Sequence, residues 1–169
     1  MNWLAALPAG ARVLDLAAGA GRHARAAAAL GLQVVAVDRD VAALAAGPGL
    51  QVRQADLEQG PWPFADGEAY DAVVVSRYLF RPRFALLAAL LAPGGRLIYE
   101  TFARGNERYG RPSNPAFLLE AGELLERSRR AGLVVLSYEH GFTPTPAPAV
   151  MQRVCAVRPP LDEPAPALG

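Results

Sequence analysis

The chain has 169 residues, of which 52% are hydrophobic and 20% are charged. This hydrophobic share excludes an intrinsically disordered chain, and the length suits one domain with a single core. The formal net charge of +1 excludes a strong overall attraction to nucleic acid. The single cysteine, Cys155, excludes an internal disulfide framework, and the absence of lysine excludes a Schiff-base lysine.

Nothing in the sequence indicates export or insertion into a membrane. The first residues, Met1–Leu4, carry neither the basic residues nor the long apolar run of a secretory signal. No stretch of about 20 residues avoids charges, glycine and proline well enough to span a bilayer. We therefore expect a cytoplasmic protein without a membrane attachment.

The first part of the chain alternates apolar strands with an alanine-rich helix. Residues 1–10 are a short lead-in, and the apolar run at 11–16 predicts a buried strand. Arg22–Leu30 is rich in the best helix former, and Gly31 follows where helices commonly end. The valine-rich run at 33–38 predicts a second strand, buried on both faces as in a parallel sheet.

The middle of the chain continues this alternation with one interruption. Val41–Ala46 predicts a short helix, and Leu50–Ala55 alternates like a third strand. Residues 56–69 combine proline, glycine and acidic residues, which predicts a long loop. Asp71–Ser76 predicts a fourth buried strand, and Phe84–Ala92 predicts the helix after it.

The last part of the chain adds three strands and one helix. Arg96–Thr101 predicts the fifth strand, and residues 103–116 form a polar loop. Phe117–Arg130 predicts an amphipathic helix whose basic residues near the C-terminus suit the helix dipole. Two final strands are expected at 133–138 and at about 150–157, with no helix between them.

This order of elements predicts an α/β fold, a doubly wound and mainly parallel sheet with helices on both faces. The final two strands should pair antiparallel at one edge, because no crossover helix joins them. We expect residues 1–158 to form a single domain. Residues 159–169, rich in proline and alanine, are expected to be a frayed tail.

The clearest functional signal is the segment Asp15-Leu16-Ala17-Ala18-Gly19-Ala20-Gly21 between the first strand and the first helix. Gly19 and Gly21 stand where the chain must reverse, and glycine permits both the turn and a close ligand. The helix that follows offers unpaired N–H groups to a carboxylate. The segment therefore predicts a nucleotide-type cofactor site at the end of the first strand.

Acidic residues also follow the next two strands. Asp38 can accept hydrogen bonds from both ribose hydroxyls, and Asp56 can accept one from an adenine amine, with Leu57 beside the ring. The glycine pattern also fits a dinucleotide site, because short glycine motifs are not specific. Asp15 favours S-adenosylmethionine instead, because a carboxylate at that position would repel a pyrophosphate. Each residue taken alone has a rival interpretation. The glycines can form a purely structural turn, Asp15 can cap a helix or order a loop, and Asp56 can be a solvated loop carboxylate.

Together these motifs resemble the class I S-adenosylmethionine-dependent methyltransferases over residues 11–158. The resemblance implies a Rossmann-like seven-stranded sheet of order 3-2-1-4-5-7-6, with strand 7 antiparallel. It also implies that Gly19 and Gly21 contact the methionine part of S-adenosylmethionine, Asp38 the ribose and Asp56 the adenine. Ala17 stands where many members have glycine. The cofactor-binding residues we expect are Asp15, Ala17, Gly19, Gly21, Asp38, Arg39, Asp56, Leu57 and Ser76.

Within the family, residues 15–24 look most like small bacterial methyltransferases related to tellurite resistance. The stretch Tyr99–Phe102 and the loop Gly105–Pro115 are also similar to uncharacterised proteins near that group. An Asn-Pro-Pro-Tyr-like signature is lacking after the fourth strand, so amino-group methylation of DNA bases or glutamine is not indicated.

The acceptor should lie beyond the fourth and fifth strands, because methyl transfer needs an aligned nucleophile. Glu100 is the candidate base, with an ion pair to a loop arginine as the alternative. Arg77 contacts the acceptor in this hypothesis, and Tyr109 acts from a loop that closes over the site. The arginines that we place at this edge suit an anionic acceptor, or they are a solvated loop surface. They are Arg77, Arg81, Arg104, Arg108 and Arg111.

The leading hypothesis is in-line methyl transfer from S-adenosylmethionine to a small-molecule acceptor, with S-adenosylhomocysteine as the product. A catalytically silent cofactor-binding partner subunit and an RNA methyltransferase remain as alternatives, although the near-neutral charge disfavours nucleic acid. His23 and His140 lack partners at ligand spacing, so no metal site is expected. The sequence leaves the oligomeric state open, a homodimer included.

Overall fold

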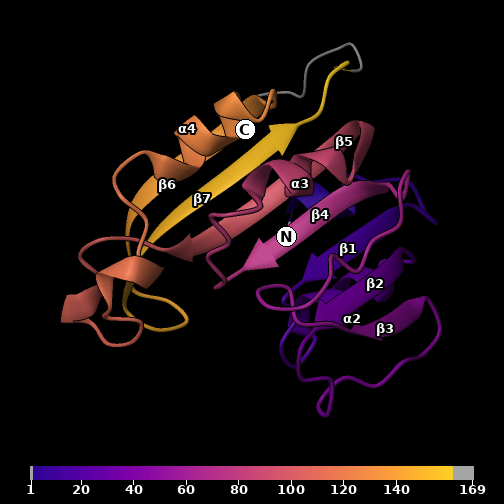
Figure 1. The fold of residues 1–169 in the computed structure, drawn as a ribbon, viewed down its shortest axis with the longest axis horizontal. Helices are drawn as coiled ribbons and strands as arrows, with labels where there is room; N and C mark the ends of the chain where they lie inside the picture. The colour runs from indigo at the N-terminus through magenta and orange to yellow at the C-terminus, as the bar shows by residue number, and fades with distance from the viewer. Residues whose placement is uncertain (1, 162–169) are drawn as a thin grey trace.

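The computed structural model describes residues 2–161, which form a seven-stranded sheet of order β3-β2-β1-β4-β5-β7-β6 (Figure 1). Strands β1 to β5 are parallel, and β7 runs antiparallel between β5 and β6. The predicted α/β fold and strand order are therefore confirmed. The strands are β1 Arg12–Leu16, β2 Gln33–Asp38, β3 Leu50–Gln54, β4 Tyr70–Ser76, β5 Leu91–Phe102, β6 Val134–Thr143 and β7 Ala149–Val157.

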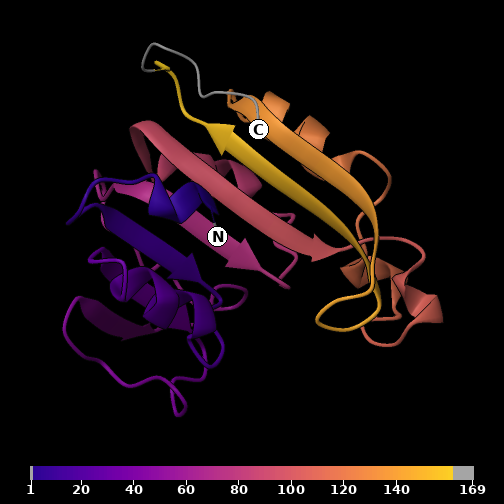
Figure 2. The ribbon, with the colours of Figure 1, turned by 180° about the vertical axis from the view of Figure 1, so that it is seen from behind.

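Helices cover both faces of the sheet. Helix α3 (Phe84–Ala89) and helix α4 (Glu123–Arg130) lie on the face seen in Figure 1, and α1 (Asn2–Ala5) and α2 (Arg22–Ala28) lie on the other face, seen in Figure 2. Alternate side chains of the central strands therefore enter two cores, because neighbouring strand residues point to opposite faces. Val73 and Val75 belong to the core under α3, and Ala72 and Val74 belong to the core under α2.

One helix prediction was wrong and two were wrong in part. The helix predicted at Phe84–Ala92 ends at Ala89, and β5 begins at Leu91. Val41–Ala46 forms turns and extended chain rather than a helix. Asp38 and Asp40 side chains each accept a hydrogen bond from the backbone N–H two residues later, and such local bonds compete with a helix. The predicted helix Phe117–Arg130 begins at Glu123, because residues before it form a 3₁₀ turn, η2 (Pro115–Phe117), and then extended chain.

The extended chain before α4 is held by the sheet. The Leu119 N–H donates to the Phe102 carbonyl at 2.9 Å, and the Arg104 N–H donates to the Leu119 carbonyl at 3.0 Å. A second 3₁₀ turn, η1 (Asn106–Arg108), lies in the same long connection. The loop expected at 56–69 is confirmed. Most of the expected C-terminal tail, residues 162–169, lies outside the described residues.

Candidate functional site

The turn between β1 and α2 has an unusual backbone. Gly19 and Gly21 adopt φ angles of 54° and 74°, and Ala17 adopts a φ of 56°. Such left-handed angles cost an L-residue energy that glycine escapes. A Cβ at Gly19 would meet no atom within 4 Å, whereas a Cβ at Gly21 would overlap the side chain of Leu44. The positive φ therefore favours glycine at Gly21, where a side chain would also displace Leu44, while Gly19 leaves open space in front of the backbone.

Asp15 lies beneath this turn and is 2% exposed. Burial raises the pKa of Asp15 to about 7; the backbone amide of Ala24 partly offsets this, and the nearby Asp38 adds to it. Its Oδ2 atom accepts no hydrogen bond from the described residues. A buried carboxylate oxygen without a donor is costly. The position therefore suits a ligand ammonium group or an ordered water at the turn.

Asp38, at the end of β2, ties the turn to the sheet. Its Oδ2 accepts a hydrogen bond from the Gly19 N–H at 2.8 Å, and its Oδ1 accepts one from the Asp40 N–H at 3.0 Å. Arg39 follows, and its carbonyl accepts a bond from the Gln54 side chain at 3.0 Å. The carboxylate of Asp38 is therefore fixed at the carboxyl end of the sheet, beside the glycine turn.

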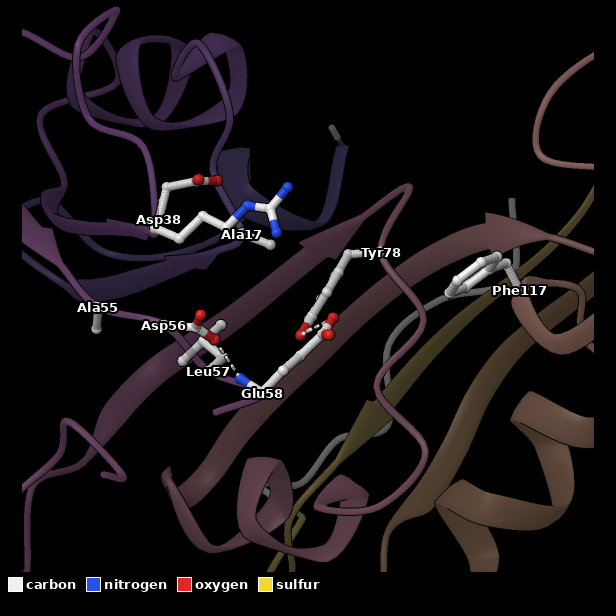
Figure 3. Close-up of a pocket in the computed structure, with 9 residues that line it drawn as sticks. Ala17, Asp38, Ala55, Asp56, Leu57, Glu58, Tyr78 and Phe117 are labelled. Atoms are coloured by element: carbon white, nitrogen blue, oxygen red, sulfur yellow. Dashed lines mark hydrogen bonds between the residues drawn. The ribbon is translucent and has the colours of Figure 1, made fainter. Parts of the chain in front are cut away.

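A cavity of about 370 Å³, here called the edge cavity, opens at the carboxyl ends of β2 and β3 (Figure 3). Its size lies within the usual range of small-molecule sites, about 300–1,000 Å³. Five of the nine predicted cofactor residues line it, and the other four, Asp15, Gly19, Gly21 and Ser76, do not. The lining is Ala17, Asp38, Arg39, Ala55, Asp56, Leu57, Glu58, Tyr78 and Phe117.

The loop after β3 gives the edge cavity its acidic floor. Asp56 Oδ1 accepts hydrogen bonds from the N–H groups of Glu58 and Gln59, at 2.9 and 3.0 Å. These two bonds hold the pKa of Asp56 below its ordinary value. Tyr78 donates its hydroxyl to Glu58 at 3.3 Å, and burial followed by the charge of Glu58 raises the pKa of Tyr78 (Figure 3). Asp56 and Glu58 therefore both line the cavity, and the two backbone bonds fix the position of the Asp56 side chain.

Glu58, Tyr78 and Phe117 were missed as parts of this cavity. Tyr78 follows β4 by two residues, so the end of that strand could have indicated it. No sequence pattern indicated Phe117 as a cavity residue, because the amphipathic pattern placed it in the predicted helix Phe117–Arg130. In the structure it is 57% exposed and reaches the cavity from the η2 turn. Arg81 holds that turn from inside, with bonds to the carbonyls of Ala116 and Leu118.

The predicted acceptor-side residues separate in the structure. Glu100 accepts hydrogen bonds from Ser76 Oγ at 2.9 Å and from Arg153 Nε at 3.2 Å. The predicted alternative of an ion pair therefore holds, but the partner comes from β7 and not from the five loop arginines. Arg77 has a φ of 56° and places its guanidinium 5.8 Å from the centre of the Phe102 ring.

Tyr109 lies farther out, against the β6–β7 hairpin. It is 48% exposed, and its ring centre lies 5.0 Å from that of Phe142. Two of the five loop arginines have other partners, because Arg81 pairs with Glu123 and Arg104 pairs with Glu120. The loop surface is thus less cationic than the sequence indicates.

Two further results concern the part of the chain that the structure describes. Among these residues, no helix combines the length and the apolar character that a bilayer crossing requires. Within residues 2–161, no three histidine, cysteine, aspartate or glutamate side chains gather into a metal-binding group.

Comparison with known proteins agrees with this geometry. The methyltransferase domain family matches residues 13–95. Demethylmenaquinone methyltransferase of Clavibacter sepedonicus is 36% identical over 107 residues, which cover 56% of this chain and 42% of that relative. The chain thus spans less than half of the length of the curated relative that it matches.

Solved structures share the fold. An S-adenosylmethionine-dependent methyltransferase from Mesorhizobium loti has a TM-score of 0.67 and 23% identity, over 93% of this chain and 96% of that one. TehB from Haemophilus influenzae has a TM-score of 0.68 and 18% identity, over 88% of this chain and 58% of that one. Residues 13–95, which include the glycine turn, therefore match the methyltransferase domain family, and the seven-stranded sheet has the fold of S-adenosylmethionine-dependent methyltransferases.

Proposed function

We propose that this chain binds S-adenosylmethionine at the edge cavity and catalyses transfer of its methyl group to a small-molecule acceptor. The observation that carries the proposal is the meeting of Asp38 and Asp56, from the ends of β2 and β3, in one cavity beside the glycine turn. The name of the curated relative, demethylmenaquinone methyltransferase, supports a small-molecule acceptor.

The residues present fit this methyl donor. Asp38 is placed to accept from the ribose hydroxyls, and Asp56 keeps Oδ2 for the adenine amine, since Oδ1 serves the loop. Leu57 offers an apolar contact to the adenine ring. The open space at Gly19 and the donor-free oxygen of Asp15 suit the amino-acid end of the donor. Arg39 and Ala17 complete the wall.

The bound donor supplies an electrophilic methyl group, so the protein has to align the acceptor and exclude competing water. Ser76 ends β4, Arg77 and Tyr78 follow it, and Tyr78 lines the edge cavity. We assign Arg77 and Glu100 to the acceptor side of the reaction. Tyr109 is assigned to a loop that closes over the acceptor.

The test is calorimetric titration with S-adenosylhomocysteine, the expected product. The Asp38→Asn variant is expected to bind about tenfold to a hundredfold more weakly than the unchanged chain, as loss of paired polar contacts costs about 1–3 kcal/mol. Asp66→Asn is the matched control, because Asp66 is exposed on the loop before β4. Equal affinities of the Asp38→Asn variant and the unchanged chain would refute the ribose assignment. Absence of any binding would refute the proposed function.

The two alternative functions have their own tests. A monomer, shown by light scattering, that releases S-adenosylhomocysteine on its own excludes a silent partner subunit. The α4 arginines give little support to RNA binding, because Arg127 pairs with Glu123 and Arg130 pairs with Glu126. Retention of bulk tRNA on a filter at low salt, lost steeply as salt rises, would revive that alternative.

A further inference from the structure

A second cavity of about 370 Å³, here called the sheet-face cavity, lies on the opposite side of the β4 end from the edge cavity. Its floor is the face of the sheet on the α1 side, where Figure 2 shows the short helix α1 near β5, with β7 and β6 farther along the sheet. Trp3 and Leu4 of α1 form one wall, and His23 of α2 stands at the rim. The Trp3 carbonyl accepts a bond from Arg96 at 3.0 Å, which fixes α1 to β5.

The floor consists of two rows of side chains that cross four strands. In one row Val74 pairs with Ile98, Ile98 with Cys155, and Cys155 with Ser137. This row is apolar apart from Ser137 at its end. It offers a flat surface, because strand residues in register stand side by side on one face.

The second row lies two residues nearer the carboxyl ends of β4 and β5 and is polar. Ser76 pairs with Glu100, Glu100 with Arg153, and Arg153 with Glu139. Each neighbouring pair is hydrogen-bonded, at 2.9, 3.2 and 3.2 Å. Glu100 is therefore held from both sides, in the middle of the polar row.

The two cavities share one short wall. Ser76 lines the sheet-face cavity, and Tyr78 lines the edge cavity. Arg77 between them has a φ of 56°, a strained angle for a residue with a side chain. The linings of the sheet-face cavity and the edge cavity thus approach each other at the end of β4.

The charged side chains that line the sheet-face cavity are mostly acidic, while Arg22 lies outside the lining, 3.2 Å from the His23 ring. Glu100 and Glu139 face a single guanidinium, that of Arg153, which bonds to both. The pKa of His23 lies below its ordinary value because of burial and then the charge of Arg22, so its ring is neutral at pH 7. The lining thus carries one net negative charge, next to an apolar floor.

Building on the proposed function, we infer that the sheet-face cavity binds the methyl acceptor, and that this acceptor is an uncharged aromatic molecule whose hydroxyl group donates to Glu100. The apolar row and Trp3 hold the ring system between them. The polar row fixes the hydroxyl at the end nearest the edge cavity. This assignment makes Glu100 a catalytic residue, and Ser76 and Arg153 positioning residues for its carboxylate.

The methyl transfer requires no reactant besides the methyl donor, the acceptor and water. The hydroxyl oxygen forms a bond to the methyl carbon while the carbon–sulfur bond of the donor breaks, and the sulfur keeps that electron pair. The hydroxyl proton passes to the Glu100 carboxylate and then to water. The acceptor becomes a stronger acid as its oxygen acquires positive charge, so the proton moves to Glu100 as the new bond forms.

The experiment measures S-adenosylhomocysteine formation with 2-naphthol and with 2-naphthoate, which share a ring system and differ in charge. Turnover of 2-naphthol alone is expected. The Ser137→Trp variant fills the sheet-face cavity from β6 and should lower kcat/KM at least tenfold. His140→Trp is the control, because its exposed side chain alternates to the other face of β6. Glu100→Gln should lower kcat far more than it changes KM.

Calorimetry with S-adenosylhomocysteine and thermal melting accompany each variant. The inference requires that Ser137→Trp and Glu100→Gln keep product affinity within about twofold and remain folded. It is overturned if 2-naphthoate is turned over in preference to 2-naphthol, if neither compound is turned over while the product still binds, or if Ser137→Trp leaves kcat/KM unchanged. Failure of the unchanged chain to bind S-adenosylhomocysteine would instead refute the proposed function.

Discussion

Replacement of the buried Asp15 by asparagine should make the protein more stable in neutral and mildly alkaline solution. The carboxylate is 2% exposed, and its Oδ2 accepts no hydrogen bond from the described residues. Asparagine has the same shape and needs no burial of charge. The gain should depend on pH in a way that only a raised pKa can explain.

The sign and the size of the effect follow from the two states of Asp15. Burial raises the pKa of the folded carboxyl from 3.8 to about 7. Below pH 3.8 both states are protonated, and the group has no effect on stability. Between pH 3.8 and about 7 only the unfolded chain ionises, so stability falls as pH rises. Above about pH 7 the loss is complete and corresponds to about 4 kcal/mol at most.

Urea unfolding at several pH values between about 4 and 8 measures this. The difference in unfolding free energy between Asp15→Asn and the unchanged chain should grow from near zero at about pH 4 to a few kcal/mol at about pH 8. Taking the difference removes the contribution of all other titrating groups. The exposed Asp66→Asn variant should show no such slope. A constant difference across this range would refute the raised pKa of Asp15.

Three further predictions concern the scaffold of the site. Tyr99→Phe should lower the unfolding free energy by about 1–3 kcal/mol, because the buried Phe80 N–H loses its 3.0 Å bond to the tyrosine hydroxyl. Urea unfolding measures this, and an unchanged free energy would contradict it. Ala17→Gly should raise the unfolding free energy by up to about 1 kcal/mol, because glycine adopts the φ of 56° without strain. A clear loss of stability would show that Ala17 is not strained. Burial raises the pKa of Glu123, but bonds led by that from Arg81 outweigh it and lower the pKa to about 2. Its contribution of about 2 kcal/mol should therefore be present above pH 4.5 and vanish toward pH 2, and Glu123→Gln should flatten this acid limb of stability.

The sequence alone predicted the sheet and the acidic edge because both depend on local patterns. Apolar runs such as 33–38 locate parallel strands, and the chain order of strands and helices limits the topology. Asp38 is the last residue of β2, and Asp56 comes two residues after the end of β3. The two aspartates lie close together because β2 and β3 are parallel, so that their carboxyl ends meet at one edge of the sheet.

Contacts between distant segments could not be predicted in this way. Glu100 and Arg153 are 53 positions apart, and only the register of β5 against β7 makes them partners. The pattern around Phe117 satisfied a helix, but bonds to Phe102 and Arg104 keep Leu119 extended. Here tertiary hydrogen bonds outweighed a local preference, which is weak for a single turn of helix.

The clamp that Arg81 makes on the η2 turn has a consequence for ligand exchange. Its guanidinium joins Glu123 of α4 to the carbonyls on either side of Phe117, and Phe117 stands at the mouth of the edge cavity. We therefore expect the rate at which a ligand leaves the edge cavity to depend in part on the ion pair of Arg81 with Glu123. A substitution on α4 that touches no ligand should speed dissociation while the equilibrium contacts inside the cavity stay intact.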